Sequence, residues 1–450
     1  MTSRAKLRDL GLFDARAPRY TSYPPANHFS DLAADSTETW IRALPSGARV
    51  SLYLHVPYCR RLCWFCACRT QGTSTDRPLV PYVDMLKREL EIVDGMLGKD
   101  VVLSRIHFGG GTPTILPPEL IAELGGMLDG FRDRSDDFEF SVEIDPTEVD
   151  QARIDAFAAL GMSRASIGVQ DFDPIVQESI GRLQSFEQTR DVVERLRAAG
   201  VGSLNMDILY GLPHQTRARM AASVEKVLEL APDRVALYGY AHVPWMAKRQ
   251  VMIPADALPD AEERLDLFEA ARKLFLWRDY AEIGIDHFAR KSDSMAHAAD
   301  DGTLARNFQG YTVDPSDALI GLGASAISRY PQGFAQNHST SSKYTGAVQD
   351  GRLATVRGHA MSDDDLLRSD LIEDLMCRFA IDLNARAAQH GRPLAELEEM
   401  CASIHADFEG WVEQDGPLLR ITREPHLIAR LVAQKLDAYL MPEGRHSKAL

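Results

Sequence analysis

The stretch 51-SLYLHVPYCRRLCWFCACRT-70 decides the fold, because it joins an apolar run directly to four of the six cysteines in the chain. Residues 52–56 read as a short buried strand, and the first cysteine, Cys59, follows it closely. In parallel α/β folds, active sites gather at the carboxyl ends of strands. The stretch therefore predicts a metal-binding loop at the end of the first strand of such a fold.

Five further β-rich runs follow at intervals, separated by helical patterns. The runs lie at 101–108, 138–144, 163–169, 203–212 and 234–240. Between them, segments such as 80–97 and 189–200 have apolar residues at three- and four-residue spacing. This rhythm predicts an α/β fold with a parallel sheet and right-handed crossovers. We expect a partial (β/α)6 TIM-like barrel over residues 49–330, although the pattern alone also allows a doubly wound open sheet.

The regions on either side of the barrel have a different character. Residues 1–48 form an N-terminal extension, in which 18–29 is punctuated by prolines and reads as extended chain. The strand rhythm stops near residue 330, and residues 331–450 predict a small, mainly helical, winged-helix-like C-terminal domain with a short β-wing at 416–424. Scattered acidic residues on these helices count against DNA binding and favour a packing role.

Composition argues against three classes of protein: nucleic-acid-binding proteins, membrane proteins and disulfide-rich secreted proteins. The formal charge of −15 over 450 residues argues against wholesale binding of nucleic acid or an anionic membrane. No window reaches the roughly 18 unbroken apolar residues of a membrane span, and the first residues lack the apolar core of a signal peptide. Six cysteines in a chain of this length do not form a disulfide framework, so we expect a reducing cytoplasm. Nothing in the sequence suggests an obligate partner, and we expect a monomer. Cys377 and Cys401 are expected to be buried, unreactive thiols.

The spacing of the clustered cysteines indicates the kind of metal centre. Cys59, Cys63 and Cys66 form C-x3-C-x2-C, and Cys68 adds C-x-C. A structural zinc ion usually takes two separated pairs of ligands, and Cys68 is awkwardly close to Cys66 for a shared ion. Three thiolates from one compact loop favour a [4Fe–4S] cluster with one open iron. Zinc and a four-cysteine electron-transfer cluster remain as alternatives.

Polar or flexible residues also mark the ends of the later strands. In 107-HFGGGTPT-114, three glycines let backbone groups approach a ligand without intervening side chains. Asp207 lies within an apolar strand, so its carboxylate needs a cationic or hydroxyl partner. The simplest interpretation of Arg182 is an arginine exposed on the surface, and the alternative is an arginine that binds the carboxylate of a ligand. The other strand-end candidates are Glu143, Gln170 and Ala241.

The cysteine spacing, with Tyr58 before the first cysteine and Phe65 before the third, resembles the signature of the radical S-adenosylmethionine (SAM) enzymes. The resemblance implies that the open iron chelates the amino and carboxylate groups of SAM. One-electron reduction then cleaves the sulfonium and releases a 5′-deoxyadenosyl radical. The signature indicates the class of chemistry and says little about the substrate.

Longer motifs narrow the resemblance. PRYTSYP, GGGTPT, EIDP, GVQDF, DILYGLP, GIDHFAR, RNFQGYT and GASAIS occur in this order along the chain. Together they resemble the oxygen-independent coproporphyrinogen III oxidase family. This implies oxidative decarboxylation of two propionates of coproporphyrinogen III to vinyls, giving protoporphyrinogen IX in heme biosynthesis. The implied partners are the tetrapyrrole, an electron donor for the cluster and a final electron acceptor.

The same resemblance assigns roles to individual residues, including sites for two SAM molecules. The implied cluster ligands are Cys59, Cys63 and Cys66. The residues implied to bind the first SAM are Tyr53, Gly110, Glu143 and Ile327, and those implied to bind the second are Phe65, Gly111, Thr112, Gln170, Arg182, Asp207 and Ala241. The residues implied to be important for catalysis are His55, Cys68, Phe308 and Gln309. We also expect the N-terminal extension, with Arg19 and Tyr20, to cover the barrel mouth.

Two other functions remain as alternatives. A sister branch with a similar cluster acts as a heme chaperone, but it commonly has phenylalanine at the position of Cys68 and tends to lack the PRYTSYP extension. Both features are present here, which favours the enzyme. The remaining alternative is a radical SAM enzyme that acts on another tetrapyrrole or carboxylate.

Overall fold

A single large sheet organises the barrel in the computed structural model, which describes residues 4–439. Six parallel strands lie side by side in chain order: β2 (Arg49–Val56), β5 (Val102–Gly110), β6 (Arg134–Ile144), β7 (Arg164–Gln170), β8 (Ser203–Tyr210) and β9 (Arg234–Gly239). They coincide with the six β-rich runs of the sequence. The predicted parallel α/β fold is therefore confirmed.

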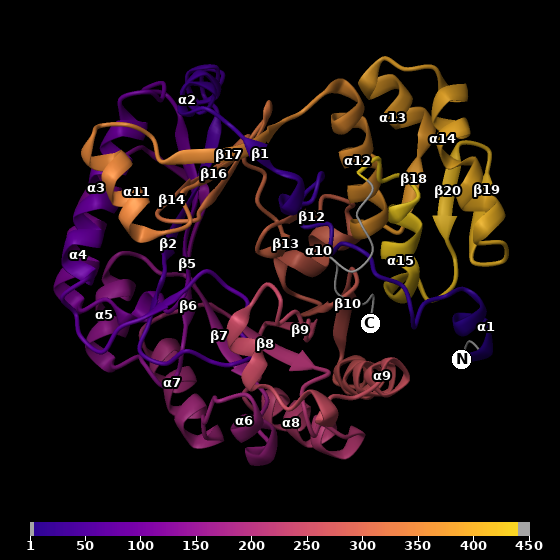
Figure 1. The fold of residues 1–450 in the computed structure, drawn as a ribbon, viewed down its shortest axis with the longest axis horizontal. Helices are drawn as coiled ribbons and strands as arrows, with labels where there is room; N and C mark the ends of the chain where they lie inside the picture. The colour runs from indigo at the N-terminus through magenta and orange to yellow at the C-terminus, as the bar shows by residue number, and fades with distance from the viewer. Residues whose placement is uncertain (1–3, 440–450) are drawn as a thin grey trace.

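Helices connect these strands and lie along the outer side of the sheet (Figure 1). They are α3 (Leu79–Asp94), α4 (Pro118–Asp129), α5 (Gln151–Ala159), α6 (Pro174–Ser179), α7 (Phe186–Ala198) and α8 (Arg217–Glu229). Each buries an apolar stripe against the strands, as Leu86 and Leu90 do in α3. Short side chains begin several of them; Ser185, for example, caps α7 by accepting from the backbone N–H of Gln188.

Alternation along the strands separates the core from the inside of the barrel. In β2, Leu52 and Leu54 are fully buried in the hydrophobic core, whereas Tyr53 and His55 face a cavity on the other side. In β8, Met206 lies in the core and Asp207 faces the cavity. Because successive strand residues point to opposite faces, a two-residue period places polar groups inside without disturbing the core.

Additional strands extend both edges of the parallel sheet. Beyond β2 lie β14 (Ala318–Leu322), β15 (Ile327–Tyr330), β16 (Gly333–Asn337), β17 (Thr355–Ala360) and β1 (Ser30–Asp31); beyond β9 lie β11 (His287–Arg290) and β10 (Tyr280–Ile283). The expectation that strands stop near residue 330 is thus wrong for β16 and β17. Antiparallel neighbours need no crossover helix, so the strand–helix rhythm ends before the strands do. The edge strands β1 and β10 are not paired with each other, so the barrel is open.

A buried carboxylate ties helix α3 to the turn between β14 and β15. Glu89 accepts hydrogen bonds from the backbone N–H of Gly323 at 2.7 Å, from Asn337 Nδ2 at 2.7 Å and from the Tyr344 hydroxyl at 2.8 Å. Burial raises the pKa of Glu89 to about 7. This network fixes the start of β15, where Ile327 lies.

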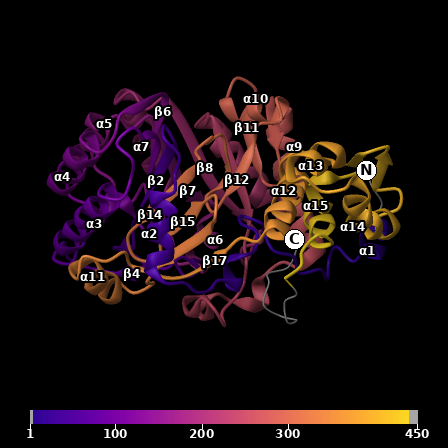
Figure 2. The same ribbon diagram turned by 90° about the horizontal axis from the view of Figure 1, so that it is seen from above.

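The C-terminal region, as far as it is described (to Tyr439), contains four helices and a small sheet. The helices are α12 (Asp363–Cys377), α13 (Leu383–His390), α14 (Leu394–Asp407) and α15 (Pro425–Gln434), and the strands are β18 (Ala380–Asp382), β19 (Val412–Asp415) and β20 (Leu418–Ile421). This region packs beside α9 (Ala261–Trp277) and α1 (Arg4–Asp9) (Figure 2). Cys377 and Cys401 are buried, as expected. The winged-helix-like shape stays a prediction.

Shorter elements complete the described chain. They are α2 (Ala34–Arg42), β3 (Tyr58–Cys59), β4 (Gln71–Gly72), α10 (Ser294–Asp300), β12 (Ala305–Asn307), β13 (Gly310–Thr312) and α11 (Ser341–Gln349). Between Arg4 and Tyr439, no helix combines the length and the apolar character that a bilayer span requires.

Candidate active site

A cavity of about 730 Å³ lies on the inner side of the sheet. Of the residues assigned a role above, those that line it are Tyr53, His55, Cys68, Gly110, Glu143, Asp207, Phe308, Gln309 and Ile327. They come from strands and loops more than 250 positions apart in the sequence. The structure therefore brings the predicted catalytic residues and the predicted first SAM set to one space.

The cysteine loop is held at the edge of this cavity by backbone and side-chain contacts. Its two ends pair as β3 and β4, with Cys59 opposite Gly72. In its middle, the N–H of Trp64 donates to the carbonyl of Ile180 at 3.0 Å. Gln250 Nε2 donates to the carbonyls of Phe65, at 2.8 Å, and Ala241, at 3.1 Å. The loop is thus held by the end of α6 and by the segment that follows β9, and two residues assigned to the second SAM share one partner.

The four clustered thiols differ in their environments. Cys59 and Cys63 are buried, Cys66 is partly buried, and Cys68 is exposed where it faces the cavity. Burial raises the pKa of Cys59 to about 11 and also raises that of Cys63, whereas a hydrogen bond with Cys68 lowers the pKa of Cys66 to about 6. Metal binding must therefore displace protons from at least the two buried thiols.

The donor set fits an iron–sulfur cluster better than zinc. Thiolates on one zinc ion, with Zn–S bonds of about 2.3 Å, lie roughly 3.8 Å apart. Within residues 4–439, the one set of three potential ligand atoms gathered within 4.8 Å lies elsewhere and contains no cysteine. The glycine loop packs directly on the first thiol, because a Cβ at Gly111 would come within 3.0 Å of Cys59 Sγ. Three spread thiols beside bare backbone form a suitable cradle for a cluster.

Glu143 joins the end of β6 to the glycine loop. Its carboxylate accepts from the N–H of Gly110 at 3.0 Å and lies 3.3 Å from His107 Nε2. Burial opposes ionisation, but the hydrogen bond and charge of His107, with the Gly110 N–H, hold the pKa of Glu143 below its usual value. A Cβ at Gly109 would lie 2.7 Å from Glu143 Oε1, so glycine is needed there. An ionised carboxylate therefore faces the cavity and can accept from an ammonium or a hydroxyl group.

Tyr53 and His55 form a second pair on the neighbouring strand. The Tyr53 hydroxyl lies 3.0 Å from His55 Nδ1, and the other ring nitrogen lies 3.3 Å from the carbonyl of Arg69. Burial lowers the pKa of His55, which favours the neutral ring. The imidazole is thereby fixed in orientation and connects the cysteine loop to β2.

Asp207 has the hydroxyl partner that the sequence requires. Its carboxylate accepts from the Ser166 hydroxyl at 3.0 Å and from Asn205 Nδ2 at 2.8 Å. Burial raises the pKa of Asp207. One strand earlier, Gln170 has a φ of 69°, a left-handed conformation that is unusual for a residue other than glycine. The ends of β7 and β8 thus have conformations and partners typical of a binding site.

Arg182 is buried, so its default interpretation as a surface arginine is wrong. Its guanidinium donates to Asp145 at 2.9 Å and to the carbonyl of Gly168 at 2.7 Å, and it lies 3.5 Å from Cys63 Sγ. Nε has no hydrogen-bond partner. The flanking sequence gives no sign of this burial, which depends on contacts with distant strand ends. The role of Arg182 as a carboxylate clamp stays a prediction.

Four arginines on the cavity wall were not predicted from the sequence. They are Arg69, Arg164, Arg234 and Arg306. Arg306 is the most constrained: its side chain is 3% exposed, lies 4.3 Å over the Tyr311 ring and reaches within 3.6 Å of Asp286. Its Nε and one terminal nitrogen have no hydrogen-bond partner. Arg306 belongs to the RNFQGYT motif, so the sequence did mark this segment. The sequence did not indicate that the Arg306 side chain lines the cavity.

The N-terminal segment lies across the same cavity. Arg19 and Thr21 line it, and Arg19 donates to the carbonyl of Gly239 while its guanidinium lies 5.9 Å from the Tyr238 ring centre. The Tyr20 hydroxyl donates to Asp437 at 3.0 Å. Aromatic rings close another side, where Phe308 packs against Phe29 and Phe334.

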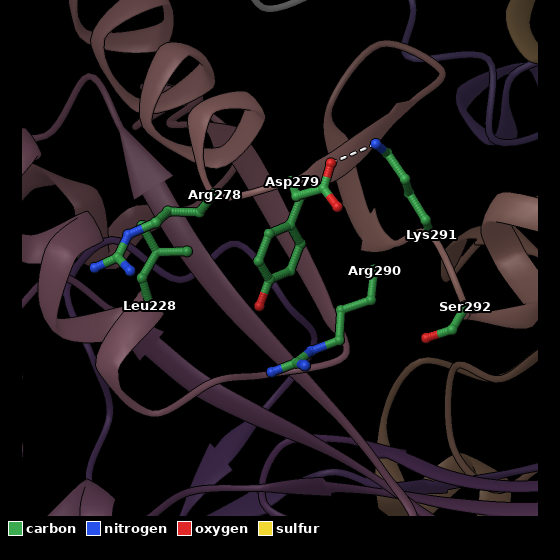
Figure 3. Close-up of a pocket in the computed structure, with 7 residues that line it drawn as sticks. Leu228, Arg278, Asp279, Arg290, Lys291 and Ser292 are labelled. Carbon is green, nitrogen blue, oxygen red and sulfur yellow. Dashed lines mark hydrogen bonds and ion pairs between the residues drawn. The ribbon is translucent and has the colours of Figure 1, made fainter.

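A second hollow, of about 430 Å³, lies at the start of β10 (Figure 3). Two of its three basic residues have polar partners: Lys291 forms an ion pair with Asp279, and Arg290 donates to the carbonyl of Pro232 at 3.0 Å. The third, Arg278, lies 5.4 Å from the Trp277 ring centre. None of the residues assigned a role from the sequence lines this hollow. The cavity beside the cysteine loop is therefore the candidate active site.

Comparisons with known proteins show which family the chain resembles. The profile of the radical SAM superfamily matches residues 53–227. The oxygen-independent coproporphyrinogen III oxidase of Paracoccus denitrificans is 53% identical over 100% of both chains. That of Pseudomonas aeruginosa is 37% identical over 95% of this chain and 94% of its own. The solved coproporphyrinogen III oxidase of Escherichia coli, described as a radical SAM enzyme, superposes with a TM-score of 0.90 and 34% identity over 94% of this chain and 98% of its own.

Proposed function

The chain belongs to the oxygen-independent coproporphyrinogen III oxidases, which are radical SAM enzymes, and we propose that it converts two propionates of coproporphyrinogen III to vinyl groups. The product is protoporphyrinogen IX, an intermediate of heme biosynthesis. One observation carries the proposal: the end of the cysteine loop, residues 67–69, and the Glu143–Gly110 pair line the same cavity. A radical-generating centre and its substrate must share one enclosed space.

The cofactors are a [4Fe–4S] cluster and SAM. Cys59, Cys63 and Cys66 would hold the cluster, and the ionised Glu143 and the Gly110 backbone would hold the first SAM, with Tyr53 and Ile327 beside them. When bound, the cluster supplies an electron and SAM supplies a radical that abstracts hydrogen. We assign a second SAM to Phe65, Gly111, Thr112, Gln170, Arg182, Asp207 and Ala241. The burial of Asp207, with its hydroxyl and amide partners, supports a role in binding a ribose or an ammonium.

Carboxylate recognition falls to the arginines of the cavity. The substrate carries four propionates, and charge-assisted pairs between guanidinium and carboxylate are strong and directional. Arg306 is the best placed for this role, because two of its buried N–H groups have no partner. Burial opposes its charge, but Tyr311 and Asp286 raise the pKa of Arg306, so it stays a cation.

The remaining residues position groups and exclude water. We propose that His55 holds the Tyr53 hydroxyl in place and that Cys68, Phe308 and Gln309 contact the reacting side of the substrate. Arg19, on the segment that lies across the cavity, would close the site after the substrate binds. A dry site protects a radical intermediate from side reactions.

Further proposals concern the setting of the reaction. We propose a cytoplasmic monomer that takes electrons from a separate donor and passes one electron per decarboxylation to a separate acceptor. We retain an N-terminal extension over residues 1–48. Because β16 and β17 belong to the main sheet, we propose that the C-terminal domain begins after β17, near residue 361, and not at 331.

Anaerobic turnover tests the function directly. The reconstituted protein is incubated with SAM, a reductant and coproporphyrinogen III, and tetrapyrroles and 5′-deoxyadenosine are quantified. The expected result is formation of monovinyl and then divinyl products together with 5′-deoxyadenosine. Stoichiometric heme binding without turnover would favour a heme chaperone instead.

A further inference from the structure

We propose that Glu269, Glu424 and His426 bind one divalent transition-metal ion where the C-terminal domain meets the barrel. Glu269 lies on α9, which follows the barrel strand β9, and the other two residues lie at the start of α15. One ligand atom from each residue falls within 4.8 Å of the others. This site is separate from the cysteine loop, and its occupation does not depend on the proposed reaction.

The distances between these atoms suit ligands that share an ion. His426 Nε2 lies 3.6 Å from Glu269 Oε1 and 3.8 Å from Glu424 Oε2. Both separations are too long for direct hydrogen bonds. Two ligands on a tetrahedral zinc ion, each bound at about 2.1 Å, lie roughly 3.4 Å apart. Small rotations of the two partly exposed glutamates would close the difference.

The histidine supplies an independent indication of a ligand. Its side chain is 3% exposed, and Nε2 has no hydrogen-bond partner although it points between two carboxylates. The Phe268 ring stacks on the imidazole at 5.6 Å and 25°, which fixes this orientation. A buried nitrogen without a partner is costly, and a metal ion would satisfy it.

The local charge also favours a cation. Arg272 is held by both oxygens of Glu282, at 2.7 and 2.8 Å, and its nearest approach to Glu269 is 3.9 Å. Glu269, Glu282 and Glu424 all lie within 4 Å of His426, and Lys273 is a second cation near Glu269. A cation placed among these three carboxylates would be stabilised by them.

The donor types select the kind of ion. One imidazole nitrogen and two carboxylate oxygens are donor types that zinc accepts, with a fourth position left for water. Magnesium and calcium prefer oxygen-only sites. The ion would link α9 to α15, and α15 also carries Arg430, whose Nε donates to the carbonyl of Pro18 at 2.9 Å. Its expected role is to stabilise the docking of α15.

Zinc binding to the cluster-loaded protein tests the site. Because cluster iron occupies the cysteine loop, the protein is dialysed anaerobically against zinc, and iron and zinc per chain are measured together. The expected result is one zinc per chain with the iron unchanged. An anomalous peak at the zinc edge between Glu269 and His426, in crystals soaked with zinc, would place the ion.

Variants make the test specific. His426→Gln and Glu269→Gln should each weaken zinc binding more than about tenfold. Glu225→Gln, on the exposed face of α8, should leave binding unchanged. Unchanged iron content shows that each variant is folded, and two variants guard against one that is not. Failure of the wild type to retain zinc, or equal retention in all three variants, would overturn the proposal, whatever the outcome of the turnover assay.

Discussion

The Glu143 carboxylate accepts a hydrogen bond from the Gly110 backbone N–H at 3.0 Å, joining the ends of two neighbouring parallel strands. The carboxylate and the glycine loop therefore move as one unit. Each would be a weak ligand by itself, because an isolated carboxylate can turn away and a bare loop can open. Together they form a preorganised acceptor for a cationic cofactor.

Removing the charge of Glu143 should separate cofactor binding from cluster assembly. Glu143→Gln retains the shape but replaces one acceptor oxygen with a donor. We expect at least about tenfold weaker SAM binding, from the loss of one charge-assisted hydrogen bond, with normal iron content. Equilibrium dialysis of the cluster-loaded protein measures this. Glu119→Gln, on the exposed face of α4, is the matched control.

The number of cluster ligands can be counted by substitution. Cys59→Ser, Cys63→Ser and Cys66→Ser should each lose most of the bound iron, because each removes one corner of the cluster. Cys68→Ser should keep the iron and lose turnover. Iron analysis and Mössbauer spectra after anaerobic reconstitution give the result. Loss of iron in Cys68→Ser would instead support a four-cysteine cluster.

Arg306 should affect the tetrapyrrole more than SAM. In Arg306→Gln, the loss of one charge-assisted pair should raise the KM for coproporphyrinogen III by about tenfold or more, with SAM binding unchanged. Arg306→Lys retains the charge and should recover part of the loss. Arg278→Gln, in the second hollow, controls for a general loss of positive charge. An unchanged KM in Arg306→Gln would remove this residue from the substrate site.

Arg19 should control the coupling of radical formation to product. Arg19→Ala removes a hydrogen bond to Gly239 at the cavity mouth, so water should reach the site more often. We expect more 5′-deoxyadenosine per vinyl group formed, as measured by chromatography of both products. Arg16→Ala, which is exposed nearby, should keep the wild-type ratio. Deleting residues 1–28 without effect on affinity or turnover would contradict a covering role for the extension.

Glu89 predicts a specific pH dependence of stability. Because its pKa rises from 4.5 to about 7 on folding, the folded state binds this proton more tightly. Its contribution is complete below pH 4.5 and is lost as the pH rises through 7, a difference of about 3 kcal/mol. Glu89→Gln should flatten this slope in urea unfolding between pH 5 and 8. An identical slope in the variant would assign the effect to other groups.

The sequence predicts the parallel core well because each strand and helix there carries its own periodic signal. Leu52 and Leu54, for example, lie in an apolar run that indicates a strand from the local sequence alone. The strands β16 and β17 were missed because β14, β15 and β16 follow one another without a helix between them, which interrupts the strand–helix rhythm before α11 and β17 are reached.

The positions of the site residues were likewise predictable only where they depend on the local sequence and the strand order. Glu143 and Gly110 could be predicted because strand ends of a parallel sheet meet at one edge. The burial of Arg182 against Asp145 and the unpartnered atoms of Arg306 could not, because they depend on which distant side chains occupy the same volume.

The unpaired edges β1 and β10 have a mechanical consequence. A closed barrel can widen only by breaking interstrand hydrogen bonds, and its opening is a round hole along the axis. An open arc of strands can instead change its twist while all of its interstrand hydrogen bonds stay intact, and its opening is the gap between the two edge strands. Such an arc can therefore widen for a bulky substrate such as a macrocycle without the loss of interstrand hydrogen bonds.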